Sequence, residues 1–353
     1  KAPVPYPPVL HSLASASTIT WLIHQKFELS IPLYRQEKEW EALGLRLSRA
    51  TMSNWLLVVY RDWLVHIVHR LKLELLKQRY LHIDETHVQV LKEPGRKNTS
   101  DSYMWVYCSI RDAVNPIRYF EYQPGRSGKY PEAFLREYEG YIHTDAYSGY
   151  NAVSGVKRCL CYTHLRRAFV DALPKDIHNS EASKPAEAIL RLNQFFNIES
   201  ELEALPPDQK KKERLIREKP LLEAFWSWAE KSAIGELPKS KLSKAFHYAL
   251  NNREGFWNYL EDGNCSISNS LAENCIRPFV IGRKNWLFSG SPKGAEASAG
   301  IYTLVETAKA NGLAPMKYIK YILSDMPGSA FLEHPEYLDD YLPWNPLVKE
   351  FCR

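Results

Sequence analysis

The stretch YLHIDETHVQV, residues 80–90, carries two adjacent carboxylates, Asp84 and Glu85, in an apolar, β-branched run that otherwise predicts a buried strand. A buried carboxylate is costly unless a cation pairs with it. A second strand-like run, IHTDAY, ends in Asp145. Acids at the ends of neighbouring strands can converge, and with a third acid they would form an oxygen-rich site that suits Mg²⁺ or Mn²⁺. Two such ions about 3.5–4 Å apart would support phosphodiester chemistry.

Each of these acids also has an ordinary interpretation, because an Asp near a strand end is usually a turn or cap residue. Glu85 must point to the face of the strand opposite Asp84, so we expect a solvated or supporting residue and not a ligand of the same metal. Three residues compete for the role of third acid: Glu273, Glu296 and Glu306.

Glu273 is favoured by its surroundings. It stands in SNSLAENCIRP, where Ser268 or Asn269 can cap a helix and place Glu273 in its first turns. Basic residues follow it, as expected where a phosphate backbone meets metal ions. The ordinary alternative is an acid that complements the helix dipole. The candidate backbone contacts in this region are Arg277, Arg283, Lys284 and Lys293.

The periodicity along the chain predicts the elements that would position these acids. Helical and strand-like segments alternate in a mixed α/β pattern with one central sheet, interrupted by a charged helical segment without strand signals. We predict these parts: a linker at 1–14, a helical domain at 15–78, a catalytic domain at 79–174 and 265–324, an α-helical insertion at 175–264, and an irregular, Pro-rich tail at 325–353.

The helical domain at 15–78 has two interpretations. Short helices joined by short turns, with Arg46, Arg49 and Arg61 around the third, resemble a helix-turn-helix unit; a plain three-helix bundle with a solvated basic face fits equally well. On the first interpretation, Arg49, Ser53 and Asn54 of the helix capped by Ser48 would read DNA in the major groove.

Composition sets broad limits on the class of protein. The 353 residues are 45% hydrophobic and 25% charged with a net charge of +5, which is compatible with a polyanionic partner if the positive charge is clustered. No apolar run is long enough to span a membrane and no signal peptide begins the chain, so we expect a cytoplasmic location. The plentiful Trp and Tyr residues suit core packing better than base stacking.

The cysteines predict no disulfide framework. Cys161 and His164 form a C-x-x-H pair that could be half of a zinc site, but no second half is evident, since Cys265 and Cys275 are distant in sequence. The six cysteines stand at positions 108, 159, 161, 265, 275 and 352.

Taken together and in order, several motifs resemble the large transposase of the IS sixty-six family of bacterial insertion sequences. They run from about residue 9 to about residue 344, and PLYRQEKEWEALGLRLSRATMSNW resembles the family's helix-turn-helix region. The central motifs are HIDET, TDAYSGYN, CYTHLRRAF, NSLAENCIRPFVIGRKNWLFSGS and IYTLVETAKANG.

The resemblance implies an RNase H-like catalytic fold and a DDE triad. Asp84 matches the family's D-E-T motif, Asp145 its D-A-Y-x-G-Y motif, and Glu273 the Glu before its I-R-P. The triad would hold two Mg²⁺ or Mn²⁺ ions. The family's His in C-W-A-H matches His164, which would contact DNA phosphate or order the Asp145 loop, with packing as the alternative.

Two stretches depart from the family's pattern. Ser268 and Ser270 flank Asn269 where the family usually has Asp-Asn-Asn, and Asn274 replaces an Arg. Neither change removes a triad acid. Family members often also carry an N-terminal cysteine-rich extension, which would precede this chain or be missing from it.

We therefore expect a DDE transposase that hydrolyses a phosphodiester at a transposon end and then transfers the freed 3′-OH to target DNA. A nuclease that cleaves without joining and a non-catalytic, transposase-derived DNA-binding protein are the alternatives. The expected partners are the terminal inverted repeats and target DNA, a second copy of the chain on paired ends, and small accessory proteins of the kind the family's elements encode. The expected location is the bacterial cytoplasm, at the nucleoid.

Overall fold

The computed structural model describes residues 6–174 and 183–353; the parts of the predicted linker and insertion at 1–5 and 175–182 lie outside this range. The chain divides into two compact units. The first contains residues 1–78, 83–130 and 271–353, and the second contains residues 79–82 and 131–270. No helix in the described ranges is long and apolar enough to cross a membrane.

A mixed sheet confirms the predicted α/β class. Its strand order is β3-β2-β1-β4-β5, with β6 pairing separately with β1. β2 and β3 are antiparallel, whereas β1 is parallel to β4, as β4 is to β5. The strands are β1 (Tyr80–Val90), β2 (Asp101–Ser109), β3 (Arg118–Gln123), β4 (Gly140–Thr144), β5 (Val156–Leu160) and β6 (Phe288–Ser289).

The first unit begins with helices whose starts follow ordinary capping rules. The Ser15 side chain caps the first helix, and Ser48 caps the third as expected. These helices are α1 (Ala16–Ile23), α2 (Leu33–Ala42), α3 (Arg49–Val59) and α4 (Val65–Leu76), with π-helical segments at His24–Glu28 and Tyr60–Leu64. Whether they act as a helix-turn-helix stays a prediction.

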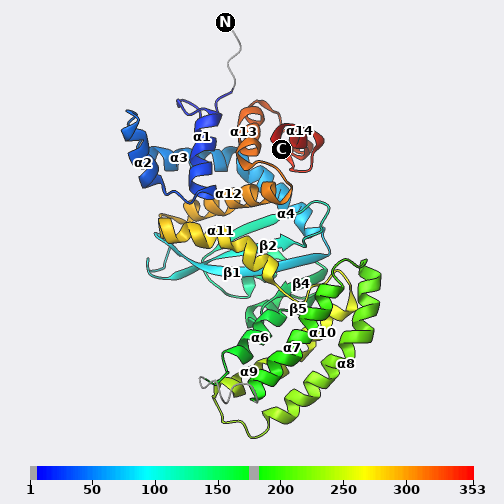
Figure 1. The fold of residues 1–353 in the computed structure, drawn as a ribbon. Helices are drawn as coiled ribbons and strands as arrows, with labels where there is room; N and C mark the ends of the chain where they lie inside the picture. Colours follow the sequence, from blue (N-terminus) through cyan, green and yellow to red (C-terminus); the bar gives the residue numbers. More distant parts are fainter. Residues whose placement is uncertain (1–5, 175–182) are drawn as a thin grey trace. The chain divides into compact units, whose positions relative to one another are not determined.

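The last helices of the chain also belong to the first unit, and Figure 1 draws α11 in yellow and α12 in orange. α12 is buried along most of its length because it packs on the edge strand β3. Thr303 and Thr307 accept the backbone N–H groups of Phe120 and Arg118, which would otherwise lack sheet partners on this side. The helices are α11 (Ser270–Trp286), α12 (Pro292–Ala310), α13 (Pro315–Asp325) and α14 (Pro346–Cys352).

The second unit is a helical layer with its own aromatic core. Phe195, Phe225, Trp226 and Phe256 are fully buried and pack with residues of β5. The described part of the predicted insertion is helical, as expected. The helices are α5 (Lys129–Phe134, which begins in the first unit), α6 (Tyr162–Val170), α7 (Lys184–Glu201), α8 (Pro207–Ala233), α9 (Lys241–Asn251) and α10 (Arg253–Trp257).

The segment between β4 and β5 contains a 3-10 turn, Ser148–Ala152. Two local expectations were wrong. The tail expected to be irregular contains α14, whose Val348 is buried. The expected linker is partly packed, because Val9 is buried and the Trp63 indole donates a hydrogen bond to the carbonyl of Pro8. Short apolar contacts order these segments where their composition alone predicts irregular chain.

Candidate catalytic site and nucleic-acid interface

Asp84 lies in the middle of β1 and is half-buried. Its Oδ1 accepts the backbone N–H of Glu85 at 2.9 Å. Because side chains alternate along a strand, Asp84 shares its face of β1 with Thr86. The acid that the sequence singled out therefore stands within the sheet and is not a turn residue at its end.

Glu85 has a structural partner. Its side chain is 1% exposed and its Oε1 accepts a hydrogen bond from the Arg126 guanidinium at 2.6 Å. The expectation of a solvated Glu85 was wrong, because burial requires the carboxylate to be paired. The alternative, a supporting residue, fits this ion pair.

Glu273 lies in the first turn of α11, as predicted, and is half-buried. The other end of α11 is fixed on β1, because Arg283 donates hydrogen bonds to Thr86 Oγ1 at 3.0 Å and to the carbonyl oxygen of His87. Burial lowers the pKa of Arg283. The helix that carries Glu273 is thus bonded to the face of β1 on which Asp84 stands.

The rival acids have other settings. Glu306 forms an ion pair with Lys309 at 2.8 Å, one turn further along α12. Glu296 is exposed on the same helix. Neither observation excludes a rival, but Glu273 alone combines the first turn of a helix with nearby basic residues.

Asp145 follows β4 directly and is half-buried in the second unit. Its Oδ1 accepts the N–H of Tyr147 at 2.9 Å. Arg158 of β5 holds this loop, donating to the backbone carbonyls of Asp145 at 2.6 Å and Tyr147 at 2.8 Å and to Thr144 Oγ1 at 2.7 Å. The sequence reasoning missed Arg158, although a basic residue inside the apolar run VKRCLC was an available signal.

Cys161 immediately precedes α6 and is buried. Burial favours its neutral thiol, but hydrogen bonds from His164 and from the backbone N–H of Asn269, 3.1 Å from Sγ, outweigh this and lower the pKa of Cys161. Cys161 and His164 are thus hydrogen-bonded to each other within the second unit. Contact of His164 with DNA stays a prediction.

Asn269 was one of the two residues expected to cap α11, but its side-chain oxygen contacts a histidine of β1. Its Oδ1 lies 2.9 Å from Nδ1 of buried His82 on β1. The His82 ring stacks on that of His143 in β4, with centroids 4.2 Å apart. The other expected cap, Ser268, does accept the N–H of Ser270 at the start of the helix.

A second cluster joins His143 to two cysteines that the sequence did not connect. His143, Cys159 and Cys265 are each 1% exposed, and one ligand atom from each lies within 4.8 Å of the other two. Hydrogen bonding to Cys159 and burial raise the pKa of the Cys265 thiol. The sequence does not reveal the cluster, because its members are far apart along the chain. His143 and Cys159 become neighbours only when β4 pairs with β5.

The candidate DNA-binding residues are distributed over two regions of the first unit. Arg49 and Asn54 are exposed on α3, where Ser53 is half-buried. Trp286 packs edge-on against Phe279 at 5.3 Å, which supports packing over base stacking. The other exposed candidates are Arg277, Lys284 and Lys293.

A shallow depression of about 500 Å³ lies beside the end of α11. Arg283 and Lys284 line it together with His87, Gln89 and Asp101 of the strand region, so cationic and hydrogen-bonding groups face one hollow. Asp84 and Glu273 belong to the first unit and Asp145 to the second. The convergence of the three carboxylates stays a prediction.

The sheet with its acids on β1, after β4 and in α11 is consistent with an RNase H-like domain of the DDE class. Residues 11–297 match the family described as "Transposase IS66 family". The chain belongs to this family, and the family that the motifs suggested is confirmed.

Curated relatives come from Sinorhizobium fredii. "Uncharacterized protein y4hP" is 25% identical over 98% of this chain, and "Uncharacterized protein y4qI" is 27% identical over 94%. The chain spans 64% and 63% of these two relatives. The matches thus extend beyond the motifs to nearly the whole chain.

Proposed function

We propose that this chain is the catalytic part of a DNA transposase, in which Asp84, Asp145 and Glu273 form the DDE triad. The observation that carries the proposal is the placement of Glu273 in the first turn of α11, a helix fixed by Arg283 on the strand of Asp84. Membership of the IS66 family supports the reaction class.

The donor chemistry of the three acids fits Mg²⁺ or Mn²⁺. All three side chains are half-buried carboxylates, and hard divalent cations prefer such oxygen ligands while retaining water. Two bound ions would lower the pKa of a water molecule and stabilise the leaving oxygen of the phosphodiester. This donor set differs from the sulfur and nitrogen ligands typical of structural zinc sites.

The protein's own contribution is to position the acids and the DNA. Arg158 fixes the loop of Asp145 through three hydrogen bonds, and Arg283 fixes α11. Exposed Arg277, Lys284 and Lys293 would neutralise backbone phosphates near the reacting bond. After cleavage, the freed 3′-OH would take the place of water and attack the target strand, so no covalent protein–DNA intermediate is required.

Recognition of the transposon ends would fall to the N-terminal helices. Arg49 and Asn54 are exposed on α3 and can donate hydrogen bonds to base edges in the major groove, with Ser53 beside them. Cutting at two ends implies two copies of the chain on paired DNA. We expect His164 to act near the Asp145 loop, because its hydrogen-bond partner Cys161 donates a backbone N–H to the carbonyl of Thr144, the residue before Asp145.

The test is a cleavage and joining assay on DNA carrying the ends of the element, with Mg²⁺ or Mn²⁺. Asp84→Asn, Asp145→Asn and Glu273→Gln should each bind DNA normally and lose about 100-fold or more of both activities, because each removes charge from the metal ligands. Glu350→Gln is the matched control, since it neutralises an exposed acid on α14 and should keep full activity.

The outcomes separate the alternatives. Cleavage without joined products would indicate a nuclease, and binding without cleavage would indicate a DNA-binding derivative. If Glu273→Gln stays active while Glu306→Gln is inactive, the third acid has been misassigned. Full activity of all three triad variants would refute the proposal.

A further inference from the structure

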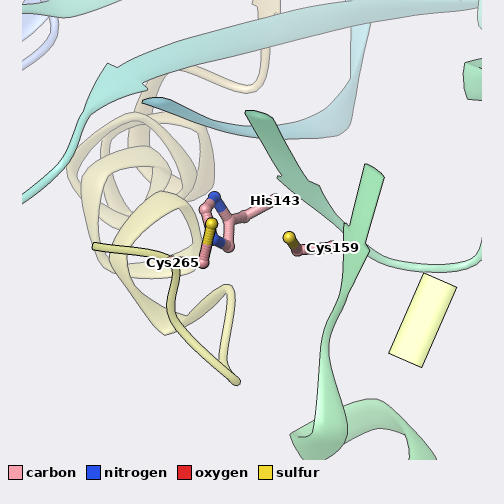
Figure 2. Close-up of side chains that lie close together, drawn as sticks. All are labelled: His143, Cys159 and Cys265. Atoms are coloured by element: carbon pink, nitrogen blue, oxygen red, sulfur yellow. The ribbon is translucent and has the colours of Figure 1, made fainter. Parts of the chain in front are cut away.

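We propose that His143, Cys159 and Cys265 form a buried site for a thiophilic cation of the Zn²⁺ class, separate from the Mg²⁺ or Mn²⁺ ligands. The three residues come from three segments of the second unit: β4, β5 and the loop that follows α10. Figure 2 shows their side chains gathered close together.

Strand pairing brings the first two ligands together. His143 and Cys159 are directly paired in the parallel register of β4 and β5, so their side chains leave the sheet on the same face. Cys265 approaches from the loop, which is fixed because Arg214 of α8 donates a hydrogen bond to its carbonyl at 2.7 Å. The ligand positions are therefore set by backbone structure and do not depend on flexible side chains alone.

The spacing suits a metal after a small contraction. The three ligand atoms lie within 4.8 Å of one another. Tetrahedral zinc with two sulfurs at about 2.3 Å and a nitrogen at about 2.0–2.1 Å has ligand–ligand distances of about 3.6–3.8 Å. Cys₂His is an established zinc ligand set, and three protein ligands leave a fourth position for water or another small ligand.

The hydrogen bonds of His143 prepare its ring for this role. Nδ1 lies 3.1 Å from the carbonyl oxygen of Leu81, and Nε2 accepts the backbone N–H of Ser266 at 2.9 Å. The ring is thus assigned as the Nδ1–H tautomer with its lone pair on Nε2. Metal-ligating histidines are commonly held by a bond from the other nitrogen to a backbone carbonyl.

Binding has a definite cost and a definite selectivity. The cation would replace the hydrogen bond from Ser266 at Nε2, and both thiols would release their protons. Two thiolates and an imidazole favour Zn²⁺ over Mg²⁺, so this site would not compete for the ions of the triad. The bound cation would cross-link β4, β5 and the segment that leads toward α11, next in the chain to Asp145 and Glu273.

The test uses Co²⁺ as a spectroscopic probe of the whole chain. The protein is stripped of metal under reducing conditions and titrated with Co²⁺. Wild type should develop a thiolate-to-cobalt charge-transfer band that saturates at one ion per chain and disappears when Zn²⁺ is added. Cys159→Ser and Cys265→Ser should lose the band, whereas Cys352→Ser, which removes a buried thiol in α14, should keep it.

A second measurement covers variants that fail to fold. In folded wild type, Zn²⁺ should protect Cys159 and Cys265, but not Cys352, from alkylation as read by mass spectrometry under mildly destabilising conditions. The proposal is overturned by the absence of a cobalt band in wild type, by a band that survives in the Cys159 and Cys265 variants, or by a band lost only in Cys161→Ser. A Cys159–Cys265 disulfide with no metal bound would also overturn it.

Discussion

The buried guanidinium of Arg214 should be among the most important single side chains for the stability of the second unit. Its side chain is fully buried on α8. It forms a two-point ion pair with Glu199, at 2.6 and 2.8 Å, and donates to the backbone carbonyls of Tyr259, Asp262 and Cys265. Arg214→Met keeps much of the volume but removes all of these bonds.

The expected loss follows from what the substitution leaves behind. Removing one partner of a buried ion pair costs about 3–5 kcal/mol, and Glu199 would keep only Lys210, at 3.3 Å, as a cationic partner among the described residues. The three carbonyls lose charge-assisted bonds as well, so we apply the whole of that range. At about 2–4 °C per kcal/mol, the thermal transition of this unit should fall by about 6–20 °C.

The assay is differential scanning calorimetry with a matched control on the same helix. Arg217 forms an ion pair with Glu201, but its side chain is 35% exposed. Arg217→Met should therefore leave the thermal transition almost unchanged. Arg214→Lys should be intermediate, since it retains the charge but not the planar fork. A loss below about 1 kcal/mol for Arg214→Met would refute the reasoning.

Three further predictions test other contacts. Burial, with repulsion from Glu199, raises the pKa of Glu218 to about 7. As pH rises, the unfolded chain therefore loses this proton before the folded chain does, and the free energy of unfolding should fall by up to about 3 kcal/mol between pH 4.5 and 7. Urea unfolding across this pH range checks it, because Glu218→Gln should lack this dependence of stability on pH. Arg158→Ala should leave DNA binding intact but raise the Mg²⁺ concentration needed for half-maximal cleavage, because the Asp145 loop loses its three bonds; an unchanged Mg²⁺ titration would contradict it. Gly300→Ala should lower the free energy of unfolding by about 1–3 kcal/mol, since the new Cβ would lie 2.1 Å from the Tyr60 ring. The loss should be smaller in a Tyr60→Ala protein, where the clash is absent. An equal loss with Tyr60 and with Ala at position 60 would exclude this clash as the cause.

Local signals explain what the sequence could predict. The cap at Ser48 and the apolar, β-branched run of β1 depend on neighbours in the chain, and each element appears where expected. Asp84 and Glu273 were placed on the right elements for the same reason. The family was recognisable because its motifs occur in order along the chain.

Contacts between distant segments explain what could not be predicted. The short β6 exists because Phe288 and Ser289 pair with the end of β1, about 200 residues earlier. The cysteine cluster needs the register of β4 against β5. Neither feature has a periodic or capping signal in the sequence.

The insertion is more than an appended helical layer. Arg214 of α8 reaches the backbone at three points between Tyr259 and Cys265, and this stretch leads within a few residues to Asn269 and the start of α11. The sequence between α10 and α11 has little regular structure of its own, so its path depends on that buried guanidinium. Loosening it should therefore disturb the Asn269–His82 contact as well as the thermal stability. If Arg214→Lys lowers DNA cleavage more than its loss of stability explains, the insertion has a positioning role in catalysis; if activity follows the folded fraction alone, its role is structural.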